Sequence, residues 1–225
     1  MSENNSQTIQ DYLKHIYNLT ENGTPANTSL LASQLGLKPG SVSEMVSRLS
    51  ATEPPLVNYI KYQGVTLTTL GREMALRVIR RHRLIETFLV EVLGYSWDMV
   101  HEEACELEHV VTDIFEARIA SVLGNPRFSP HGEPIPEVDL SMPAQFTTKL
   151  GSLLPGQKAI IQQVPDSDPE LLRYLRTIAI VPQKELVVLN RSNFDGNLTL
   201  SLQGQSENII LGPVITKKIF VTIME

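Results

Sequence analysis

The residues best suited to chemistry are concentrated in one nine-residue stretch, HEEACELEH, at positions 101–109. It contains two histidines, four glutamates and the only cysteine of the 225-residue chain. At about 100° per residue on a helix, His101, Cys105, Glu108 and His109 fall within about 100° of arc and share one face. Imidazole, carboxylate and thiolate together suit a borderline transition ion such as Mn²⁺, Fe²⁺, Co²⁺ or Zn²⁺.

Two further potential ligands lie upstream in RRHRLIE, at positions 80–86. His82 and Glu86 are four residues apart and therefore share a face of the preceding predicted helix. If the two helices are antiparallel neighbours, six ligand side chains converge, which exceeds what one tetrahedral site would use. The alternative is a solvated face of glutamate and histidine, which is the more common situation for any one of these residues taken singly. The presence of histidine and glutamate on both of these adjacent helices, together with the only cysteine, favours two neighbouring metal sites.

These residues do not form a recognisable catalytic pattern. The HExxH spacing of zinc proteases is absent, because position 105 is cysteine rather than histidine. No P-loop, GxGxxG or serine nucleophile elbow occurs in the chain. A catalytic metal would also need an open coordination position beside a substrate pocket. We therefore do not expect an enzyme or a small-molecule substrate. A metal site coupled to a winged helix, which the preceding part of the chain predicts, suggests a metal sensor instead.

The composition describes an ordinary globular chain, with 42% hydrophobic residues, 20% charged residues and a net charge of −6. The acidic excess lies in residues 76–143, which carry 12 acidic and 6 basic side chains, so a bound divalent cation would offset it there. No apolar run is long enough to span a membrane, and the polar N-terminus has no signal architecture. We expect a cytoplasmic protein without a membrane partner. The single cysteine excludes an internal disulfide framework.

The elements before this acidic centre predict a winged helix over residues 1–71. A helix over TIQDYLKHIYNLTENG stops at Asn22-Gly23, and a second helix, capped by Asn27 or Thr28, ends at Gly36. Ser41 can then cap a third helix that reaches Ser50, which completes a helix-turn-helix. The following segment, LVNYIKYQGVTLTTLG, alternates as a hairpin around Gln63-Gly64. An unrelated α+β core is the alternative, and the order of the pieces favours the winged helix.

The third helix, over residues 41–50, would enter the DNA major groove. Glu44 could accept a hydrogen bond from cytosine N4, while Lys38 and Arg48 would most simply meet phosphates. The full set of predicted DNA contacts includes one lysine of the wing: Lys38, Ser41, Ser43, Glu44, Arg48 and Lys61.

Two longer helices and a β-rich segment follow. We predict a helix from Leu70 to Gly94, capped by Thr68 or Thr69, and a second helix over 97–123. A small winged domain cannot cover their apolar sides, which favours self-association through a domain of residues 72–141. After the Pro/Gly-rich break at 124–139, four short β-runs are separated by turns: KAIIQQV, ELVVLNR, LTLSLQ and KKIFVTIM. Together with the helical insert PELLRYLRTIAI they predict a five-stranded SH3-like barrel over 142–225. The fold class is therefore mainly α with β.

Taken together, the chain resembles the metal-dependent repressors of the diphtheria toxin repressor and manganese transport regulator family. The resemblance covers essentially the full length. It rests on DYLKHIY at 11–17, KYQGVTLTTLG at the wing, RRHRLIE at 80–86, WDMVHEEACELEH at 97–109 and PHGEPIP at 130–136. The C-terminal barrel looks like the module of the longer members that is associated with ferrous transport. The resemblance implies a homodimer that binds palindromic operator DNA when loaded with Mn²⁺ or Fe²⁺ and represses metal-uptake genes.

The resemblance also implies two ligand sets. The primary site corresponds to Asp11, Cys105, Glu108 and His109, and the ancillary site to His82, Glu86 and His101. A further oxygen from the barrel would come from Asp166 or Asp168 in VPDSDPE. Some members also use the histidine of the PHG segment, here His131, which could equally be a turn residue.

The identity of the metal depends on two positions of the primary set. Iron-sensing members tend to have a thioether where this chain has Asp11 and a cysteine where it has Cys105, and manganese-sensing members have carboxylates at both. The carboxylate favours Mn²⁺, whereas the thiolate tolerates Fe²⁺ and binds Co²⁺ or Zn²⁺ strongly in vitro. We predict Mn²⁺ as the co-repressor, with Fe²⁺ as the alternative. A protein that stores or delivers metal without touching DNA is a second class of function, and the groove-compatible residues of the third helix argue against it.

Overall fold

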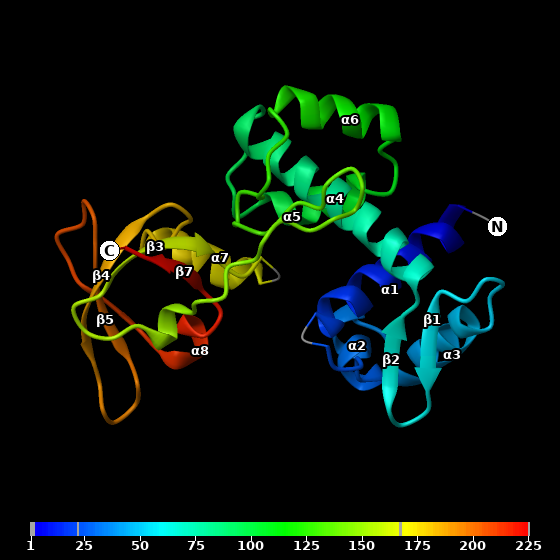
Figure 1. Cartoon of the computed structure of the whole chain (residues 1–225), viewed down its shortest axis with the longest axis horizontal. Coiled ribbons are helices and arrows are strands. Elements are labelled where there is room, and N and C mark those ends of the chain that lie inside the picture. The colour runs from blue at the N-terminus through cyan, green and yellow to red at the C-terminus, as the bar shows by residue number, and fades with distance from the viewer. Residues whose placement is uncertain (1–2, 22, 167, 225) are drawn as a thin grey trace. The chain divides into compact units, whose positions relative to one another are not determined.

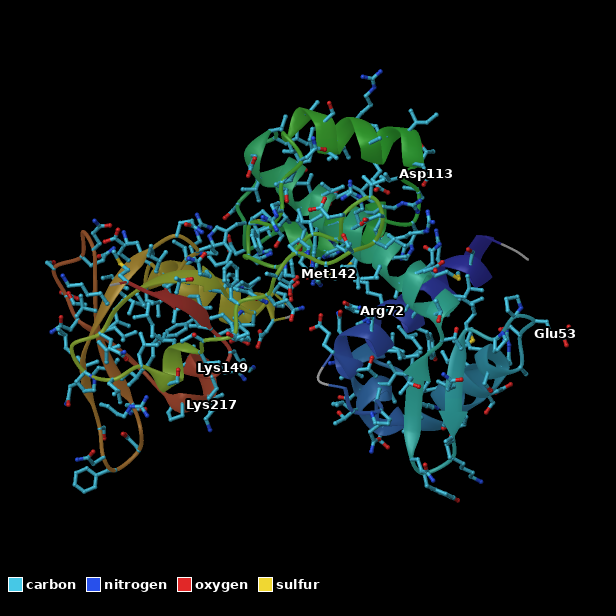
Figure 2. All side chains as sticks on the ribbon, viewed as in Figure 1. Glu53, Arg72, Asp113, Met142, Lys149 and Lys217 are labelled. Carbon is cyan, nitrogen blue, oxygen red and sulfur yellow. The ribbon has the colours of Figure 1, made fainter. Side chains whose placement is uncertain are left out.

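The structure is a computed structural model that describes residues 3–21, 23–166 and 168–224. The chain forms two compact units (Figure 1). The first unit comprises the chain up to Arg81 together with residues 136–141, and the second comprises 82–135 and the chain from Met142 onward (Figure 2). Among the described residues, no helix combines the length and the apolar character needed to cross a bilayer.

The first unit is a winged helix, as the sequence predicts. Strands β1 (Val57–Ile60) and β2 (Gly64–Leu67) form its wing and pair in antiparallel register, from Val57 opposite Leu67 to Ile60 opposite Gly64. Its elements, in chain order, are α1 (Glu3–Thr20), α2 (Thr28–Leu35), α3 (Pro39–Ser50), β1 (Val57–Ile60), β2 (Gly64–Leu67) and the first part of α4 (Thr69–Glu91).

Local chemistry sets the ends of these helices. The Asn27 side chain accepts a hydrogen bond from the backbone N–H of Ser29, and Gly36 ends α2 in the left-handed conformation with φ of 65°. The expectation that Ser41 caps α3 is wrong, because the helix begins at Pro39, whose ring fixes a helical φ at the first position. Asn22, predicted at the end of α1, lies outside the described residues.

Helix α4 begins against the wing. The Thr68 hydroxyl accepts a hydrogen bond from the Gly71 N–H at 3.1 Å, so Thr68 is the capping residue. Gly71 packs directly on the backbone, since a Cβ at this position would lie 2.0 Å from the carbonyl oxygen of Leu56. The side chains at the centre of this unit are fully or almost fully buried: Leu13, Ile16, Leu31, Val42, Val46, Leu49 and Val65.

The helical part of the second unit differs from the prediction in one respect. The predicted single helix over 97–123 is wrong, because the structure has α5 (Val100–Leu107) and α6 (Asp113–Val122) instead. Thr112 separates them: its backbone is extended, and its hydroxyl accepts a hydrogen bond from the N–H of Phe115. A helix N-cap within an apolar pattern therefore starts a new helix.

The C-terminal part of the second unit is a five-stranded antiparallel sheet of order β6-β5-β4-β3-β7, in agreement with the predicted SH3-like module. The three-residue strand β6 lies outside the β-runs singled out from the sequence. The elements are η1 (Leu150–Ser152), β3 (Lys158–Gln163), α7 (Pro169–Thr177), β4 (Glu185–Arg191), β5 (Leu198–Leu202), β6 (Ile209–Leu211), α8 (Pro213–Thr216) and β7 (Phe220–Ile223).

The barrel and the helical part of the second unit pack on each other. The indole of Trp97 contacts the barrel core, and the guanidinium of Arg176 on α7 donates to the buried carboxylate of Asp98 at 2.9 Å. On the other side, the backbone N–H of Val164 donates to the carbonyl of His131 at 2.9 Å. The segment after β3 is thus held beside α4 and α5.

Candidate metal centre

Helices α4 and α5 bring three ligand side chains together in the second unit. The Nε2 atom of His82 lies 3.1 Å from the Oε1 atom of Glu86 and 3.2 Å from the Nδ1 atom of His101. His101 Nδ1 lies 3.4 Å from the same Glu86 oxygen. The side chains of His82 and Glu86 are buried, and that of His101 is 26% exposed. These are the three residues of the predicted ancillary site.

The barrel supplies a fourth ligand atom to this cluster. A carboxylate oxygen of Asp166 and the ligand atoms of His82, Glu86 and His101 all lie within 4.8 Å of one another. Asp168, the other candidate, instead caps α7 by accepting from the backbone N–H groups of Glu170 and Leu171 at 3.1 and 3.0 Å. The structure therefore places Asp166 at the cluster and Asp168 at a helix terminus.

His131 lies at the edge of the same cluster and is fully buried. Its Nε2–H donates to the carbonyl oxygen of Trp97 at 2.7 Å, so a neutral ring carries its lone pair on Nδ1. That Nδ1 atom lies 3.7 Å from Glu86 Oε2, and both atoms are buried without a hydrogen bond from any described residue. Buried polar atoms are rarely left unpaired, and a cation would satisfy both acceptors.

Glu108 and His109 lie in the turn just after α5, which ends at Leu107, and Glu108 is joined to this cluster through His82. The Nδ1 atom of His82 lies 2.6 Å from Glu108 Oε2, and the buried Glu108 lies beside His109, with Oε1 and Nε2 3.6 Å apart. The Cys105 sulfur lies 3.8 Å from His101 Nε2, so the structure groups the thiol with His82 and His101. The remaining member of the predicted primary set, Asp11, is half-buried on α1 of the first unit.

The electrostatics of the cluster favour bound positive charge. Burial alone would raise the pKa of Glu86, but His82 and its other histidine neighbours hold it well below the usual value. The Cys105 thiol and Glu86 raise the pKa of His101 to about 10. A divalent cation suits this donor set, because it supplies the same compensating charge to buried imidazole and carboxylate ligands.

Two half-buried carboxyl groups, Glu133 and Asp166, influence each other's ionisation beside the cluster. Burial raises the pKa of Glu133 to about 8, reinforced by the neighbouring Asp166 and Glu86 carboxylates, although Arg83 opposes the shift. Burial acts against ionisation of Asp166 as well, yet the hydrogen bond from Glu133 and the nearby histidines hold its pKa below the usual value. Glu133 was not singled out by the sequence, where it is one acidic residue of PHGEPIP.

The predicted DNA-contacting residues lie on α3 and the wing of the first unit. Lys38, Glu44 and Arg48 are exposed, as is Ser41, while Ser43 is half-buried. Lys61 is exposed at the tip of the hairpin next to Tyr62, which is 94% exposed and has a φ of 67°. Tyr62 is a further candidate that the sequence pattern did not single out.

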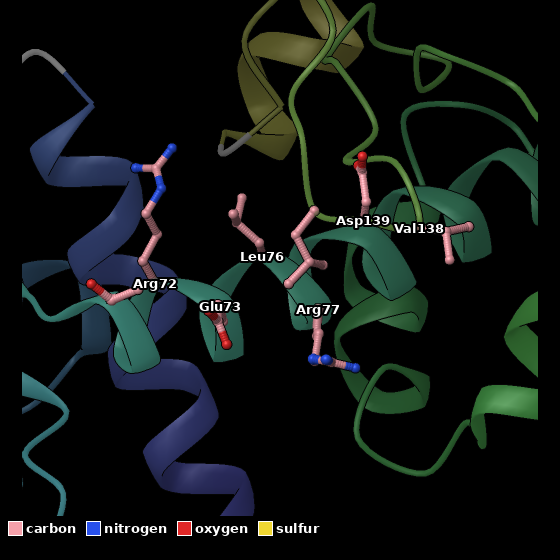
Figure 3. A pocket seen from close by; sticks show the side chains of 8 residues that line it. Arg72, Glu73, Leu76, Arg77, Val138 and Asp139 are labelled. Atoms are coloured by element: carbon pink, nitrogen blue, oxygen red, sulfur yellow. The ribbon is translucent and has the colours of Figure 1, made fainter.

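A groove of about 480 Å³ lies in the first unit between α4 and residues 136–141 (Figure 3). Arg72 and Arg77 extend from α4 in opposite directions, and Asp139 lies on the facing segment (Figure 3). The guanidinium of Arg72 lies over the ring of Tyr17, 5.0 Å from its centroid. The polar side chains that line this groove point in different directions (Figure 3), whereas those of a substrate pocket converge on the bound molecule.

Comparison with known proteins matches three consecutive domains. Residues 5–65 match the family model "Iron dependent repressor, N-terminal DNA binding domain", and residues 68–137 match "Iron dependent repressor, metal binding and dimerisation domain". Residues 148–223 match "FeoA domain". Together these matches extend over both units of the structure.

Similar individual proteins are metal-dependent repressors by name. The iron-dependent repressor IdeR of Mycobacterium leprae is 33% identical over 216 residues, which cover 91% of this chain and 92% of the relative. The diphtheria toxin repressor of Corynebacterium diphtheriae is 30% identical over 213 residues, covering 90% and 92%. A solved structure described as a manganese-dependent transcriptional repressor in complex with manganese is 38% identical, with a TM-score of 0.85 and coverage of 96% and 100%. The chain therefore belongs to the diphtheria toxin repressor family of metal-dependent transcriptional repressors.

Proposed function

We propose that this protein is a cytoplasmic repressor that binds operator DNA when loaded with Mn²⁺ and so controls genes of metal-ion homeostasis. The observation that carries the proposal is the convergence of His82, Glu86, His101 and Asp166 within 4.8 Å. Beside them lie two buried atoms, His131 Nδ1 and Glu86 Oε2, that make no hydrogen bond to the described part of the chain. Imidazole with two carboxylates is a donor set for a divalent transition ion. No catalytic role is proposed for these residues.

The predicted primary ligands explain how metal would control DNA binding. Asp11 belongs to the DNA-binding unit, whereas Cys105, Glu108 and His109 belong to the second unit. Residues that hold one ion from both units would select a single orientation of the DNA-reading helix, through a higher affinity of the metal for that state. The bound charge would also offset carboxylates near the DNA phosphates.

The predicted homodimer has a candidate surface on the second unit. Ile114 and Phe115 on α6 are 79% and 52% exposed, and Val110 and Val122 nearby in the chain are also exposed. Apolar side chains of this kind are covered when two copies associate through a twofold interface. A twofold dimer would place two α3 helices on the half-sites of a palindromic operator.

The direct test is fluorescence-anisotropy titration of a palindromic promoter duplex with metal-free protein and with Mn²⁺, Fe²⁺ or Zn²⁺ added separately. We expect tight binding with Mn²⁺ and weak binding without metal. Equal binding with and without metal would contradict a co-repressor role for this centre.

Fe²⁺ is the second candidate, and the observation that favours it is Cys105. Its sulfur lies 3.8 Å from His101 Nε2, and a thiolate in the coordination sphere suits Fe²⁺ better than Mn²⁺. Tight operator binding under anaerobic conditions with Fe²⁺ but not with Mn²⁺ would favour the iron assignment.

A further inference from the structure

The loop just before α5 makes several contacts with the barrel. The indole of Trp97 packs against the barrel core, and the Trp97 carbonyl accepts a hydrogen bond from the ring of His131 at 2.7 Å. The next residue, Asp98, has a side chain that is only 4% exposed. Because a buried carboxylate is stable only with charged or hydrogen-bonding partners, the contacts of Asp98 decide how firmly this loop is held.

Asp98 is hydrogen-bonded both within its own loop and to the barrel. The Ser96 hydroxyl donates to Asp98 Oδ1, and Nη1 of Arg176 on α7 donates to the same oxygen at 2.9 Å. The Arg176 side chain is 54% exposed, so this cation extends from the surface of the barrel to a buried anion. A charge-assisted hydrogen bond of this kind is stronger than a neutral one, and losing the cation is costly for the anion that stays buried. We call the Asp98–Arg176 pair the latch.

Helix α7 links the latch to the barrel's member of the metal cluster. Leu172 and Leu175 are buried in the barrel core, so α7 moves with the barrel. Asp168 caps the N-terminus of α7, and Arg176 lies in its last turn, about 12 Å further along the axis at 1.5 Å per residue. Asp166 lies two residues before the Asp168 cap. The cluster residue and the latch residue therefore lie toward opposite ends of one helix.

The helical part of the second unit holds the barrel on both sides of Asp166 in the chain. Before it, the backbone N–H of Val164 donates to the His131 carbonyl at 2.9 Å. After it, Arg176 is bound to Asp98, which lies two residues before the start of α5 and three before His101 of the cluster. Two attachments therefore flank the segment that brings Asp166 to His101.

We infer that Asp98 and Arg176 are positioning residues for the metal centre: the latch keeps the barrel on the loop before α5 and thereby keeps Asp166 at the ligands of α4 and α5. This inference rests on the proposed metal site and adds residues that act on it through Asp166. With the barrel undocked, the cluster lacks Asp166, so the apparent metal affinity falls with the fraction of docked molecules. By reciprocity, bound metal favours the docked barrel.

Trp97 provides a readout of docking that does not require metal, because it is the only tryptophan of the chain. Its emission is recorded in the metal-free full-length protein for the wild type and four variants. Arg176→Ala removes the cation, Arg176→Lys retains it, and Asp98→Asn removes the charge of the partner at similar volume. Arg173→Ala is the matched control, since Arg173 is exposed on the same helix three residues earlier.

We expect the Trp97 emission to shift to longer wavelength in Arg176→Ala and Asp98→Asn, because the indole gains contact with water when the barrel undocks. Arg176→Lys should restore the wild-type spectrum, since the lysine ammonium can also donate to the Asp98 carboxylate. Arg173→Ala should leave the spectrum unchanged.

Isothermal titration of the same proteins with Mn²⁺ alone, without DNA, measures the effect on the metal centre. Asp166→Ala identifies the titration step that belongs to the cluster. We expect Arg176→Ala and Asp98→Asn to weaken this step about 2- to 30-fold, the range typical of residues that act on a site through others. Arg176→Lys and Arg173→Ala should bind Mn²⁺ as the wild type does.

The two readouts separate the possible failures. A Trp97 shift in Arg176→Ala without loss of Mn²⁺ affinity would overturn the positioning role. An unchanged Trp97 spectrum in this variant, or an equal loss of affinity in Arg173→Ala, would show that the latch does not hold the barrel and would overturn the inference, while leaving the metal site intact. Absence of Mn²⁺ binding by the wild type would overturn the proposed function itself and this inference with it.

Discussion

At the scale of single residues, the centre is defined by side chains that share partners. His82 contacts Glu108 through Nδ1, and Glu86 and His101 through Nε2, so the ancillary residues and Glu108 of the predicted primary set form one connected network. Loss of one ligand should therefore affect more than one coordination position.

His109→Ala should lower the affinity for Mn²⁺ at the tightest site by about 100-fold or more, because a neutral imidazole ligand is lost. Isothermal titration with Mn²⁺ measures this change. Glu106→Ala is the control, since Glu106 is exposed on α5, three residues before His109, and belongs to none of the ligand clusters among the described residues. An unchanged affinity in His109→Ala would remove this residue from the primary set.

The pKa values of the cluster predict how the metal-free protein responds to pH. The pKa of Glu133 is raised to about 8 by burial, and that of His101 to about 10 by Cys105 and Glu86. Groups whose pKa is raised in the folded state lose their stabilising contribution as pH rises through the folded pKa. The melting temperature without metal should therefore fall between pH 6 and 9, by about 2–4 °C for each kcal/mol at this chain length. Scanning calorimetry in chelator-treated buffer tests this, and a rise over that range would contradict it.

At the scale of elements, the start of α4 depends on close backbone contact. Gly71→Ala should destabilise the first unit by about 1–3 kcal/mol, because the new Cβ would lie 2.0 Å from the Leu56 carbonyl oxygen and the helix must shift. Gly40→Ala is the matched control on α3, since nothing lies within 4 Å of a Cβ at that position. Urea unfolding compares the two, and equal stabilities would show that α4 does not rest on Leu56 as described.

At the scale of the whole molecule, the proposed switch depends on Asp11 being in one unit and the other primary ligands in the second. Asp11→Ala should leave the dimer intact and weaken metal-dependent operator binding at least about 10-fold, because metal bound to the second unit no longer selects one orientation of α3. Anisotropy titrations with and without Mn²⁺, with sedimentation to verify the dimer, measure both properties. Metal stimulation at the wild-type level in this variant would contradict the hinge mechanism.

Much of the fold could be predicted because its signals are local. The spacing of His82 and Glu86, the Asn27 cap and the left-handed Gly36 depend on residues within a few positions of each other. Reliance on local signals also explains the two errors of helix assignment, namely the Ser41 cap of α3 and the single helix over 97–123. Thr112 within an apolar pattern and Pro39 before Ser41 each offered two starting points, and the sequence pattern alone does not rank them.

By itself, the sequence determined the order of the modules and which ligand types lie on which helices, because helical periodicity and capping need only neighbouring residues. Only the tertiary structure decided that Asp166 rather than Asp168 joins His82, Glu86 and His101, and that Glu133 pairs with Arg83. Those contacts join segments that are 50 to 84 positions apart in the chain. They depend on how the barrel packs against α4 and α5, which is set by complementary surfaces that no local pattern encodes.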